Sequence, residues 1–171
     1  MPSMNTDVFE IERKFLIRYP DRDWLFANSE VTEIVQTYLV RQDPKRSARV
    51  RKRGRDGDYV YTHTVKQRIS DIRRIEIERE ISQEEYWELL KQADPKRREI
   101  HKLRCCLPYR GQMFEIDLFP FWEDRAILEI ELQDEAQPVE FPPEIEILKE
   151  VTEDRRYTNS SMAKEIPQDR I

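Results

Sequence analysis

Seven segments of the chain carry charged or polar residues at every second position. The first holds Glu10, Glu12 and Lys14, which alternate with Ile11 and Phe15. Side chains of a β-strand point alternately to its two faces, so these charges would share one face and the apolar residues the other. Six later segments repeat the pattern, with these sets: Arg49, Arg51 and Arg53; Thr62, Thr64 and Lys66; Arg74, Glu76, Glu78 and Glu80; Lys102 and Arg104; Glu115 and Asp117; Glu129 and Glu131.

Rows of acids and rows of bases in one chain predict a site for a divalent cation and a polyphosphate. Carboxylates supply the oxygen ligands that hard cations take, and Arg and Lys pair with phosphate oxygens. The chain has 30 Lys and Arg against 35 Asp and Glu. Because rows of both signs would be energetically costly on a face that only meets solvent, we expect the charged face to be enclosed.

Composition excludes several other classes of protein. With three glycines and no Walker A or dinucleotide fingerprint, any phosphate must be bound by side chains. The net charge of −5 argues against general affinity for nucleic acid. The adjacent Cys105 and Cys106 cannot easily form a bridge, and neither a membrane-length apolar run nor a signal peptide is visible. We therefore predict a cytoplasmic protein with no membrane or nucleic-acid partner.

The elements that must position these residues are mainly strands. Length predicts one domain over 1–171, with 165–171 as a loosely held tail. Alternation and β-branched or aromatic content predict eight strands, at 9–17, 32–40, 48–53, 59–67, 73–81, 99–107, 112–119 and 127–133. Turn residues separate them, and Arg55-Asp56-Gly57 reads as a hairpin corner.

Helices are fewer than strands. Ser82 and Glu85 fit a capping box before an apolar stripe that ends at Asp94-Pro95. Weaker patterns predict short helices at 23–29 and 157–165. Their apolar faces need partners, which the apolar faces of the strands can supply. The predicted fold is α+β, a closed, largely antiparallel sheet of eight strands with flanking helices.

The order of these motifs resembles the CYTH family, also called triphosphate tunnel metalloenzymes. The segment from Glu10 to Lys14 has the form Glu-x-Glu-x-Lys near the N-terminus, which is the family signature. Further matches follow in family order and span the chain from 9 to about 160: Gln36-Thr-Tyr-Leu39, Arg49-Val-Arg51, Thr64-Val-Lys66, Arg74-Ile-Glu-Ile-Glu78, Lys102-Leu-Arg104, Phe114-Glu-Ile-Asp117, Leu128-Glu-Ile-Glu131, Glu150-Val-Thr152 and Tyr157-Thr-Asn159. Thr37 and Leu103 depart from the family pattern, but neither is a charged position.

The resemblance implies an eight-stranded tunnel that holds a small-molecule triphosphate together with one or two Mg²⁺ or Mn²⁺ ions. Small bacterial members similar to this chain are inorganic triphosphatases, and this activity is our first expectation. Thiamine or nucleoside triphosphatase and class IV adenylate cyclase remain alternatives. A polyphosphate or nucleotide sensor without turnover is the non-enzyme alternative. A homodimer is compatible with the family, and the sequence leaves oligomeric state open.

Site residues follow from the charged faces and the resemblance together. Crowded carboxylates resist joint ionisation unless a cation neutralises them, so we assign as metal ligands Glu10, Glu12, Glu129, Glu131 and, with less support, Asp117. Glu76 and Glu78 are assigned to a second ion or to positioning water. The phosphate contacts are Lys14, Arg49, Arg51, Lys66, Arg74, Lys102 and Arg104.

Two further residues have competing interpretations. Tyr38 resembles a tyrosine that acts with the lysine matching Lys102 in some triphosphatases, which makes both catalytic candidates, although strand packing is the simpler role for Tyr38. Lys149 fits either a contact at the end of the tunnel or an exposed charge. The aromatic cluster of Phe119, Phe121 and Trp122 is interpreted as packing or as a tunnel rim.

Overall fold

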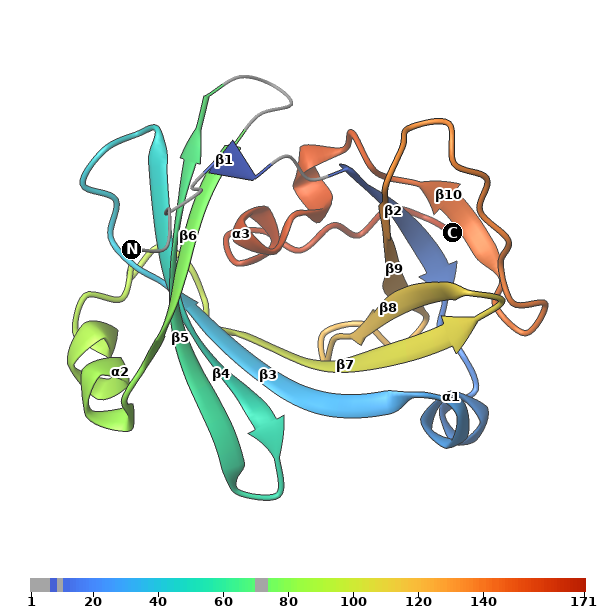
Figure 1. Cartoon of the computed structure of the whole chain (residues 1–171), viewed down its shortest axis with the longest axis horizontal. Helices are drawn as coiled ribbons and strands as arrows, with labels where there is room; N and C mark the ends of the chain where they lie inside the picture. Colours follow the sequence, from blue (N-terminus) through green and yellow to red (C-terminus); the bar gives the residue numbers. More distant parts are fainter. Residues whose placement is uncertain (1–6, 9–10, 70–73) are drawn as a thin grey trace. The chain divides into compact units, whose positions relative to one another are not determined.

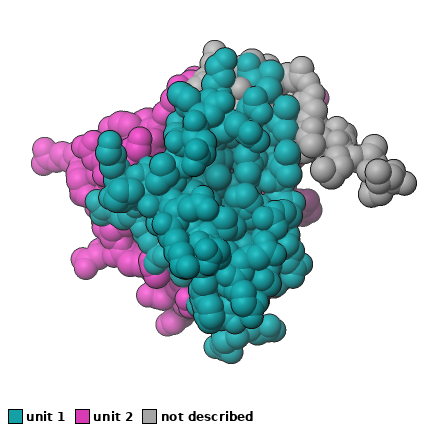
Figure 2. All heavy atoms as spheres, turned by 90° about the vertical axis from the view of Figure 1, so that its left-hand side faces the viewer, with its two compact units in different colours: residues 1–10, 35–100 teal, residues 11–34, 101–171 magenta. Residues whose placement is uncertain are grey.

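The computed structural model describes residues 7–8, 11–69 and 74–171, which fall into two compact units (Figure 2). Unit 1 comprises residues 1–10 and 35–100, and unit 2 comprises residues 11–34 and 101–171. Unit 2 is therefore built from two stretches of chain that are far apart in the sequence. The expectation of one domain over 1–171 stays a prediction.

Unit 1 contains an antiparallel sheet with the order β1-β6-β5-β4, followed by the C-terminal part of β3. Its strands are β1 (Asp7–Val8), β6 (Arg74–Ile81), β5 (Asp58–Arg68), β4 (Arg46–Arg55) and β3 (Glu30–Tyr38), of which β3 begins in unit 2. The β4–β5 corner places Asp56 at φ 53° and Gly57 at φ 85°. Both residues tolerate that left-handed backbone, so the predicted hairpin is confirmed.

Helix α2 (Gln83–Leu90) packs on this sheet (Figure 1). Its first turn is capped as the sequence predicts, since the Ser82 hydroxyl accepts a hydrogen bond from the Glu85 backbone N–H at 3.1 Å. Tyr86 is buried against Val50 and Ile81 in the apolar core of the unit. Burial raises the pKa of Tyr86 to about 12, with smaller contributions from Glu99 and Tyr61.

Unit 2 continues from the N-terminal part of β3 with the strand order β7-β8-β9-β2-β10. These strands are β7 (Ile100–Tyr109), β8 (Gln112–Leu118), β9 (Arg125–Leu132), β2 (Ile11–Arg18) and β10 (Ile147–Glu150). Neighbours from β7 to β10 are antiparallel. Because β2 lies between β9 and β10, residues 11–14 of the Glu-x-Glu-x-Lys segment are held by strands from the C-terminal half of the chain.

One face of the unit 2 sheet forms the main hydrophobic core, and helix α1 (Arg22–Asn28) covers it through Leu25. Asp21 caps this helix by accepting a hydrogen bond from the Trp24 backbone N–H. The strand residues of this core have the parity opposite to the charged ones, and they are Phe15, Ile17, Cys105, Leu107, Phe114, Ile116, Leu118, Ala126, Leu128, Ile130 and Leu132. The sequence pattern therefore assigns the two faces correctly.

The C-terminal part differs from expectation in its helices. The predicted helix at 157–165 is replaced by the short 3₁₀ turn η1 (Arg155–Tyr157) and helix α3 (Asn159–Met162). The loose tail at 165–171 stays a prediction, and two of its residues make hydrogen bonds to the rest of unit 2. The Trp122 indole N–H donates to the Pro167 carbonyl at 3.2 Å, and the Asp169 carboxylate accepts from the Tyr157 hydroxyl at 2.8 Å. These hydrogen bonds hold the segment against unit 2.

All eight predicted strands are present, as β2 to β9, and the α+β class with a large antiparallel sheet is confirmed. The predicted closed barrel of eight strands is wrong. The described strands number ten, and their linear order ends at β1 and β10. Both end strands are short, with two and four residues, so each forms few ladder hydrogen bonds. Within the described ranges, no helix has the length and apolar character needed to cross a membrane.

Candidate functional site

The charged face of unit 2 is arranged in cross-strand rows. Lys14 lies opposite Glu129, Glu129 opposite Glu115, and Glu115 opposite Cys106. This row crosses β2, β9, β8 and β7 in turn. On either side of it the strand register places Glu12 opposite Glu131, and Arg104 opposite Asp117. Residues that are far apart in the sequence thus become neighbours on one face.

Asp117 is the centre of a buried charge cluster. Its Oδ1 and Oδ2 accept hydrogen bonds from Arg104 Nε and Nη2, both at 2.9 Å, and Lys102 Nζ lies 2.9 Å from Oδ2. The Arg104 Nη1 atom is also 3.1 Å from Glu115. Asp117 is 1% exposed and Lys102 2%. Burial opposes ionisation of Asp117, but Lys102 and Arg104 outweigh it and hold its pKa below the usual range.

The same carboxylate favours the charged form of Arg104. Burial by itself would lower the pKa of Arg104, yet the adjacent Asp117 and its hydrogen bonds raise that pKa above the ordinary value. A bidentate guanidinium–carboxylate pair is among the stronger ionic contacts in proteins. The structure therefore gives Asp117 a role as counter-ion to two cations, which the sequence prediction of a metal ligand did not contain.

The segment η1–α3 contacts two lysines on the charged face of unit 2. Lys14 Nζ donates to the Tyr157 carbonyl at 3.2 Å and lies 3.3 Å from Glu129. Lys102 Nζ donates to Asn159 Oδ1 at 3.1 Å. The expected enclosure is thus observed for the part of this face around the two lysines, which a backbone carbonyl and a side-chain amide hold, whereas Glu12 and Glu131 on the same face are exposed.

Tyr157 links this cluster to the C-terminal residues. Its side chain is 0% exposed, and burial together with the hydrogen bond to Asp169 raises its pKa to about 12. Asp169 also accepts from Arg156 at 2.8 Å, and Lys149 Nζ lies 3.1 Å from it. The ambiguous Lys149 therefore pairs with Asp169.

Unit 1 places its charged side chains in three rungs across β4, β5 and β6. The rungs are Arg49–Thr64–Glu78, Arg51–Thr62–Glu80 and Ser47–Lys66–Glu76. The Thr64 hydroxyl donates to Glu78 Oε1 at 2.8 Å. Lys66 Nζ and Glu76 are 3.9 Å apart, with side chains 32% and 21% exposed.

Arginines of β4 have distinct surroundings. Arg51 Nε and Nη2 donate to Gln36 Oε1 at 3.1 and 2.9 Å. The Arg49 Nε atom is buried and has no hydrogen-bond partner among the described residues. A buried polar group of that kind is costly when it stays unpaired, so the Arg49 position favours an additional acceptor such as a phosphate oxygen.

Tyr38 is held on the same face of unit 1. Its hydroxyl lies 3.1 Å from Gln36 Nε2, and its ring lies beneath the Arg97 guanidinium, 4.9 Å from the ring centroid. Arg97 is fixed in turn by Asp94 at 2.9 Å. Tyr38 and Lys102 belong to different units, so their joint action stays a prediction.

Three of the predicted metal ligands, Glu12, Glu129 and Glu131, lie opposite another acid in the described part of the chain. Glu12 opposes Glu131, and Glu115 opposes Glu129. Like charges directly across a ladder repel, and a hard cation that takes carboxylate oxygens would relieve that repulsion. The donor chemistry therefore fits Mg²⁺ or Mn²⁺, although no described group of three or more such side chains is arranged as a metal site. Glu10 and the side chain of Arg74 lie outside the described residues.

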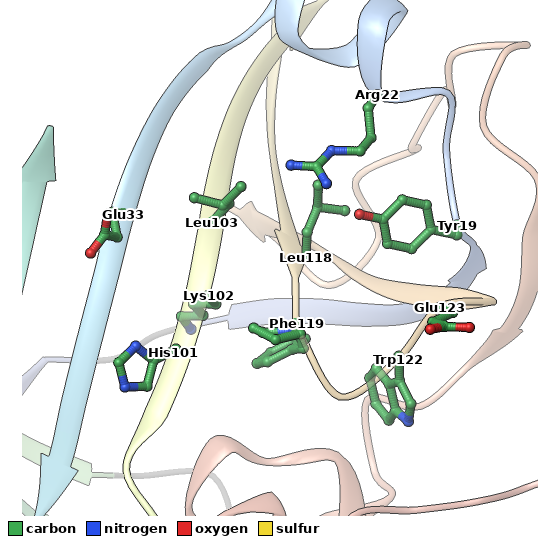
Figure 3. A pocket seen from close by; sticks show the side chains of 11 residues that line it. Tyr19, Arg22, Glu33, His101, Lys102, Leu103, Leu118, Phe119, Trp122 and Glu123 are labelled. Atoms are coloured by element: carbon green, nitrogen blue, oxygen red, sulfur yellow. The ribbon is translucent and has the colours of Figure 1, made fainter. Parts of the chain in front are cut away.

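A cavity of about 580 Å³ opens on unit 2 near α1 (Figure 3). It shares only Lys102 with the charged cluster. Arg22 and His101 line it together with the acids Glu33 and Glu123, and the aromatic rings of Phe119 and Trp122 lie at one side. This mixture of signs does not favour a polyphosphate, so the cavity is not the predicted phosphate site.

Sequence reasoning missed several residues that hold the predicted site groups in place. These are Gln36, Arg97, Asn159 and Tyr157. Gln36, Tyr157 and Asn159 lie inside segments that resemble the family motifs, and that position is the one signal that could have found them. Arg97 has no such signal.

The chain belongs to the CYTH family, because the CYTH domain matches residues 9–164. The inorganic triphosphatase of Nitrosomonas europaea is 31% identical over 160 residues, covering 92% of this chain and 99% of that protein. A crystal structure titled as an inorganic triphosphatase is also 31% identical, with TM-score 0.62, covering 94% of this chain and 97% of the other. A protein from Pyrococcus horikoshii shares the fold at 18% identity and TM-score 0.50, over 72% and 80% of the two chains.

Proposed function

We propose that this protein is a metal-dependent hydrolase of triphosphate-containing substrates, with inorganic tripolyphosphate as the preferred one. The observation that carries the proposal is the set of largely buried cations on unit 2, where Lys14, Lys102 and Arg104 are each held against a carboxylate on one face. A preorganised set of cations can stabilise the charge that develops on a transferred phosphoryl group. The similarity to a named inorganic triphosphatase supports the same activity.

The proposed roles follow the chemistry of each side chain. Lys14, Arg49, Arg51, Lys66, Arg74, Lys102 and Arg104 bind phosphate oxygens, and the planar Arg fork can grip two of them. Glu10, Glu12, Glu129 and Glu131 would hold Mg²⁺ or Mn²⁺, which supplies polarisation of the phosphate when bound. Asp117 holds Lys102 and Arg104 in place. Hydrolysis by a water in line with the leaving group needs no covalent intermediate on the protein, and Glu76 and Glu78 are proposed to position it or a second ion.

Substrate preference follows from the same faces. Charged side chains predominate on them, the polar or neutral members of the rows described above are Ser47, Thr62, Thr64, Gln36, Tyr38 and Cys106, and Leu16 and Ile127 form one apolar pair across β2 and β9. A site that gained affinity from a base would be expected to offer it an aromatic or apolar surface. Tripolyphosphate should therefore have a higher kcat/KM than ATP or thiamine triphosphate.

The deciding experiment is steady-state kinetics with these three substrates, in Mg²⁺ and in Mn²⁺, with cyclic AMP measured in parallel. Phosphate release that is fastest from tripolyphosphate supports the proposal. Preference for ATP with cyclic AMP as product would replace it with the cyclase. Tight binding of tripolyphosphate without turnover would support the alternative of a polyphosphate sensor.

Variants at the acid pairs test the metal requirement. Glu129→Gln with Glu131→Gln keeps the shape of β9 but removes two candidate ligand charges, so turnover should fall at least a hundredfold, by about 2.7 kcal/mol or more in the barrier. Glu146→Gln is the matched control, because its carboxylate is exposed and pairs with Arg18. Wild-type turnover in the double variant, or turnover in the presence of a chelator, contradicts metal dependence.

Two more substitutions test the assigned phosphate and catalytic residues. Arg51→Lys keeps the charge but loses the fork, so calorimetry with tripolyphosphate should show weaker binding, and Arg51→Glu hardly any. Arg53→Lys, at the next position on that face, is the control. Tyr38→Phe slows hydrolysis if the hydroxyl acts in catalysis and leaves it unchanged if the ring only packs.

A further inference from the structure

Gln36 connects two residues of the predicted site although the sequence assigned it no role. It lies on β3 within unit 1 and is 0% exposed. Its Oε1 accepts from both Arg51 Nε and Arg51 Nη2, at 3.1 and 2.9 Å. Its Nε2 lies 3.1 Å from the Tyr38 hydroxyl. Both ends of one buried amide are thus used by site residues.

The chemistry of the partners fixes which way the amide points. A guanidinium has donors and no acceptor, so the group that faces Arg51 must be the carbonyl oxygen of Gln36. The amide nitrogen then faces Tyr38 and donates a hydrogen bond to the Tyr38 hydroxyl oxygen. The amide is consequently anchored at one end by Tyr38 while it holds the Arg51 fork at the other.

We propose that Gln36 is a positioning residue that fixes the plane of the Arg51 guanidinium for binding of a triphosphate. The inference rests on the proposed function, because it requires Arg51 to contact phosphate. An arginine side chain loses much rotational freedom when it binds a ligand, and a neutral, buried acceptor removes that freedom beforehand without adding a negative charge of its own. Preorganisation of this kind raises affinity for the ligand.

The first test needs no ligand. Hydrogen exchange of the Arg51 Nε–H is followed by nitrogen-15 NMR, and the signal is assigned by its loss in Arg51→Lys. Exchange should be slow in the wild type and at least tenfold faster in Gln36→Met, which keeps the length of the side chain but has no amide. Tyr38→Phe should give a smaller acceleration, because it removes only the anchor of the amide. Unchanged exchange in Gln36→Met overturns the inference.

Thr37→Val is the matched control. Thr37 is the next residue on β3, is 6% exposed, and donates to Glu99 at 3.0 Å from the opposite face. The Thr37→Val variant loses one hydrogen bond at a position of similar burial to Gln36. If loss of such a bond loosened β3 in general, Arg51 Nε–H exchange would be faster in this variant as well. We expect the Arg51 Nε–H of Thr37→Val to exchange at the wild-type rate. An acceleration equal to that seen in Gln36→Met would overturn the inference.

Gln36→Glu keeps the proposal testable if Gln36→Met does not fold. A carboxylate still accepts from both Arg51 nitrogens, so slow exchange should persist. At the same time the added charge should weaken binding of tripolyphosphate. Fast exchange in this variant overturns the inference.

The second test measures the dissociation constant of tripolyphosphate by calorimetry. Gln36→Met should raise it roughly tenfold in the wild-type background and less than twofold in an Arg51→Ala background, because the effect acts through Arg51. Equal changes in both backgrounds overturn the inference. If the wild type neither binds nor hydrolyses tripolyphosphate, the proposed function fails by itself, and the exchange data still decide whether Gln36 orders Arg51.

Discussion

The charged faces of the two units differ in how their side chains are held. In unit 2, Lys102, Arg104, Asp117 and Glu129 are between 1% and 9% exposed and form direct ion pairs. In unit 1, the Lys66–Glu76 pair has a longer separation of 3.9 Å, and its side chains are 32% and 21% exposed to solvent. Buried charges must be paired to be tolerated, whereas partly exposed ones can rely on water.

This difference predicts how each face responds to change. Removing one member of the unit 2 cluster leaves its partners charged in a buried place, so stability and function fall together. Removing a member of the unit 1 rungs should affect ligand binding more than folding. Stability measurements on single variants can therefore separate structural charges from ligand-binding ones.

The largest expected effect is that of Asp117→Ala. It leaves Lys102 and Arg104 without their shared counter-ion, so the free energy of unfolding should fall by about 3–5 kcal/mol, measured by urea denaturation. Glu76→Ala is the matched change in unit 1 and should cost less than about 1 kcal/mol. Equal losses in the two variants would remove the distinction between the faces.

Acid should act most strongly on the unit 2 cluster. The Asp117 pKa is lower in the folded protein than in the unfolded chain, where it is about 3.9. The stability from this group is therefore fully present above that value and is lost as the pH falls below it. The free energy of unfolding should decline as the pH falls below about 4.

Asp117→Asn should flatten this decline in the free energy of unfolding. Asp169→Asn provides the comparison, because hydrogen bonds from Arg156 and then Tyr157 also lower the pKa of Asp169, at a more exposed site. It should flatten the decline less. If the free energy of unfolding of Asp117→Asn depends on pH as in the wild type, Asp117 is not the source of the acid sensitivity.

A smaller effect is expected inside the unit 1 rungs. Thr64→Val removes the hydrogen bond to Glu78 at 2.8 Å from a residue that is 1% exposed. The cost should be about 0.5–1.5 kcal/mol in thermal or chemical unfolding. Thr62→Val, on the same face and partly exposed, is the control and should change the free energy of unfolding by less. A cost above that of Asp117→Ala would reverse the comparison.

The smallest effect should come from the exposed pair of Arg79 and Glu85, 3.0 Å apart with both side chains 53% exposed. Arg79→Ala should change stability by about 0.2–1 kcal/mol, and the change should shrink in high salt. Unfolding at low and at high ionic strength measures it. A loss that does not depend on salt would indicate a packing role for the Arg79 side chain.

Most of the fold could be predicted from the sequence because its signals are local. Alternation with period two gave the eight main strands, and the Ser82–Glu85 capping box gave α2. Strand β10 was missed because four residues, Ile147–Glu150, carry too little pattern to be recognised. The contacts of Pro167 and Asp169 were missed because they depend on distant partners and not on composition.

The site could be predicted only as sets of residues. The faces were correct, since parity is a local property. The opposition of Lys14 to Glu129 requires knowing that β2 pairs with β9, which no local pattern states. Long-range packing likewise makes Asp117 a counter-ion of Lys102 and makes Asn159 a hydrogen-bond acceptor for the same lysine.

The discontinuous build of unit 2 has a consequence for the kinetics of folding. The Lys14 ammonium and the Tyr157 carbonyl are 143 positions apart, and β2 pairs only with β9 and β10 in the described structure. The β4–β5 and β5–β6 pairs of unit 1 join neighbouring segments and close short loops. Closing a long loop costs more entropy and slows folding. We therefore expect the β4–β6 meander to form early and β2 to dock late.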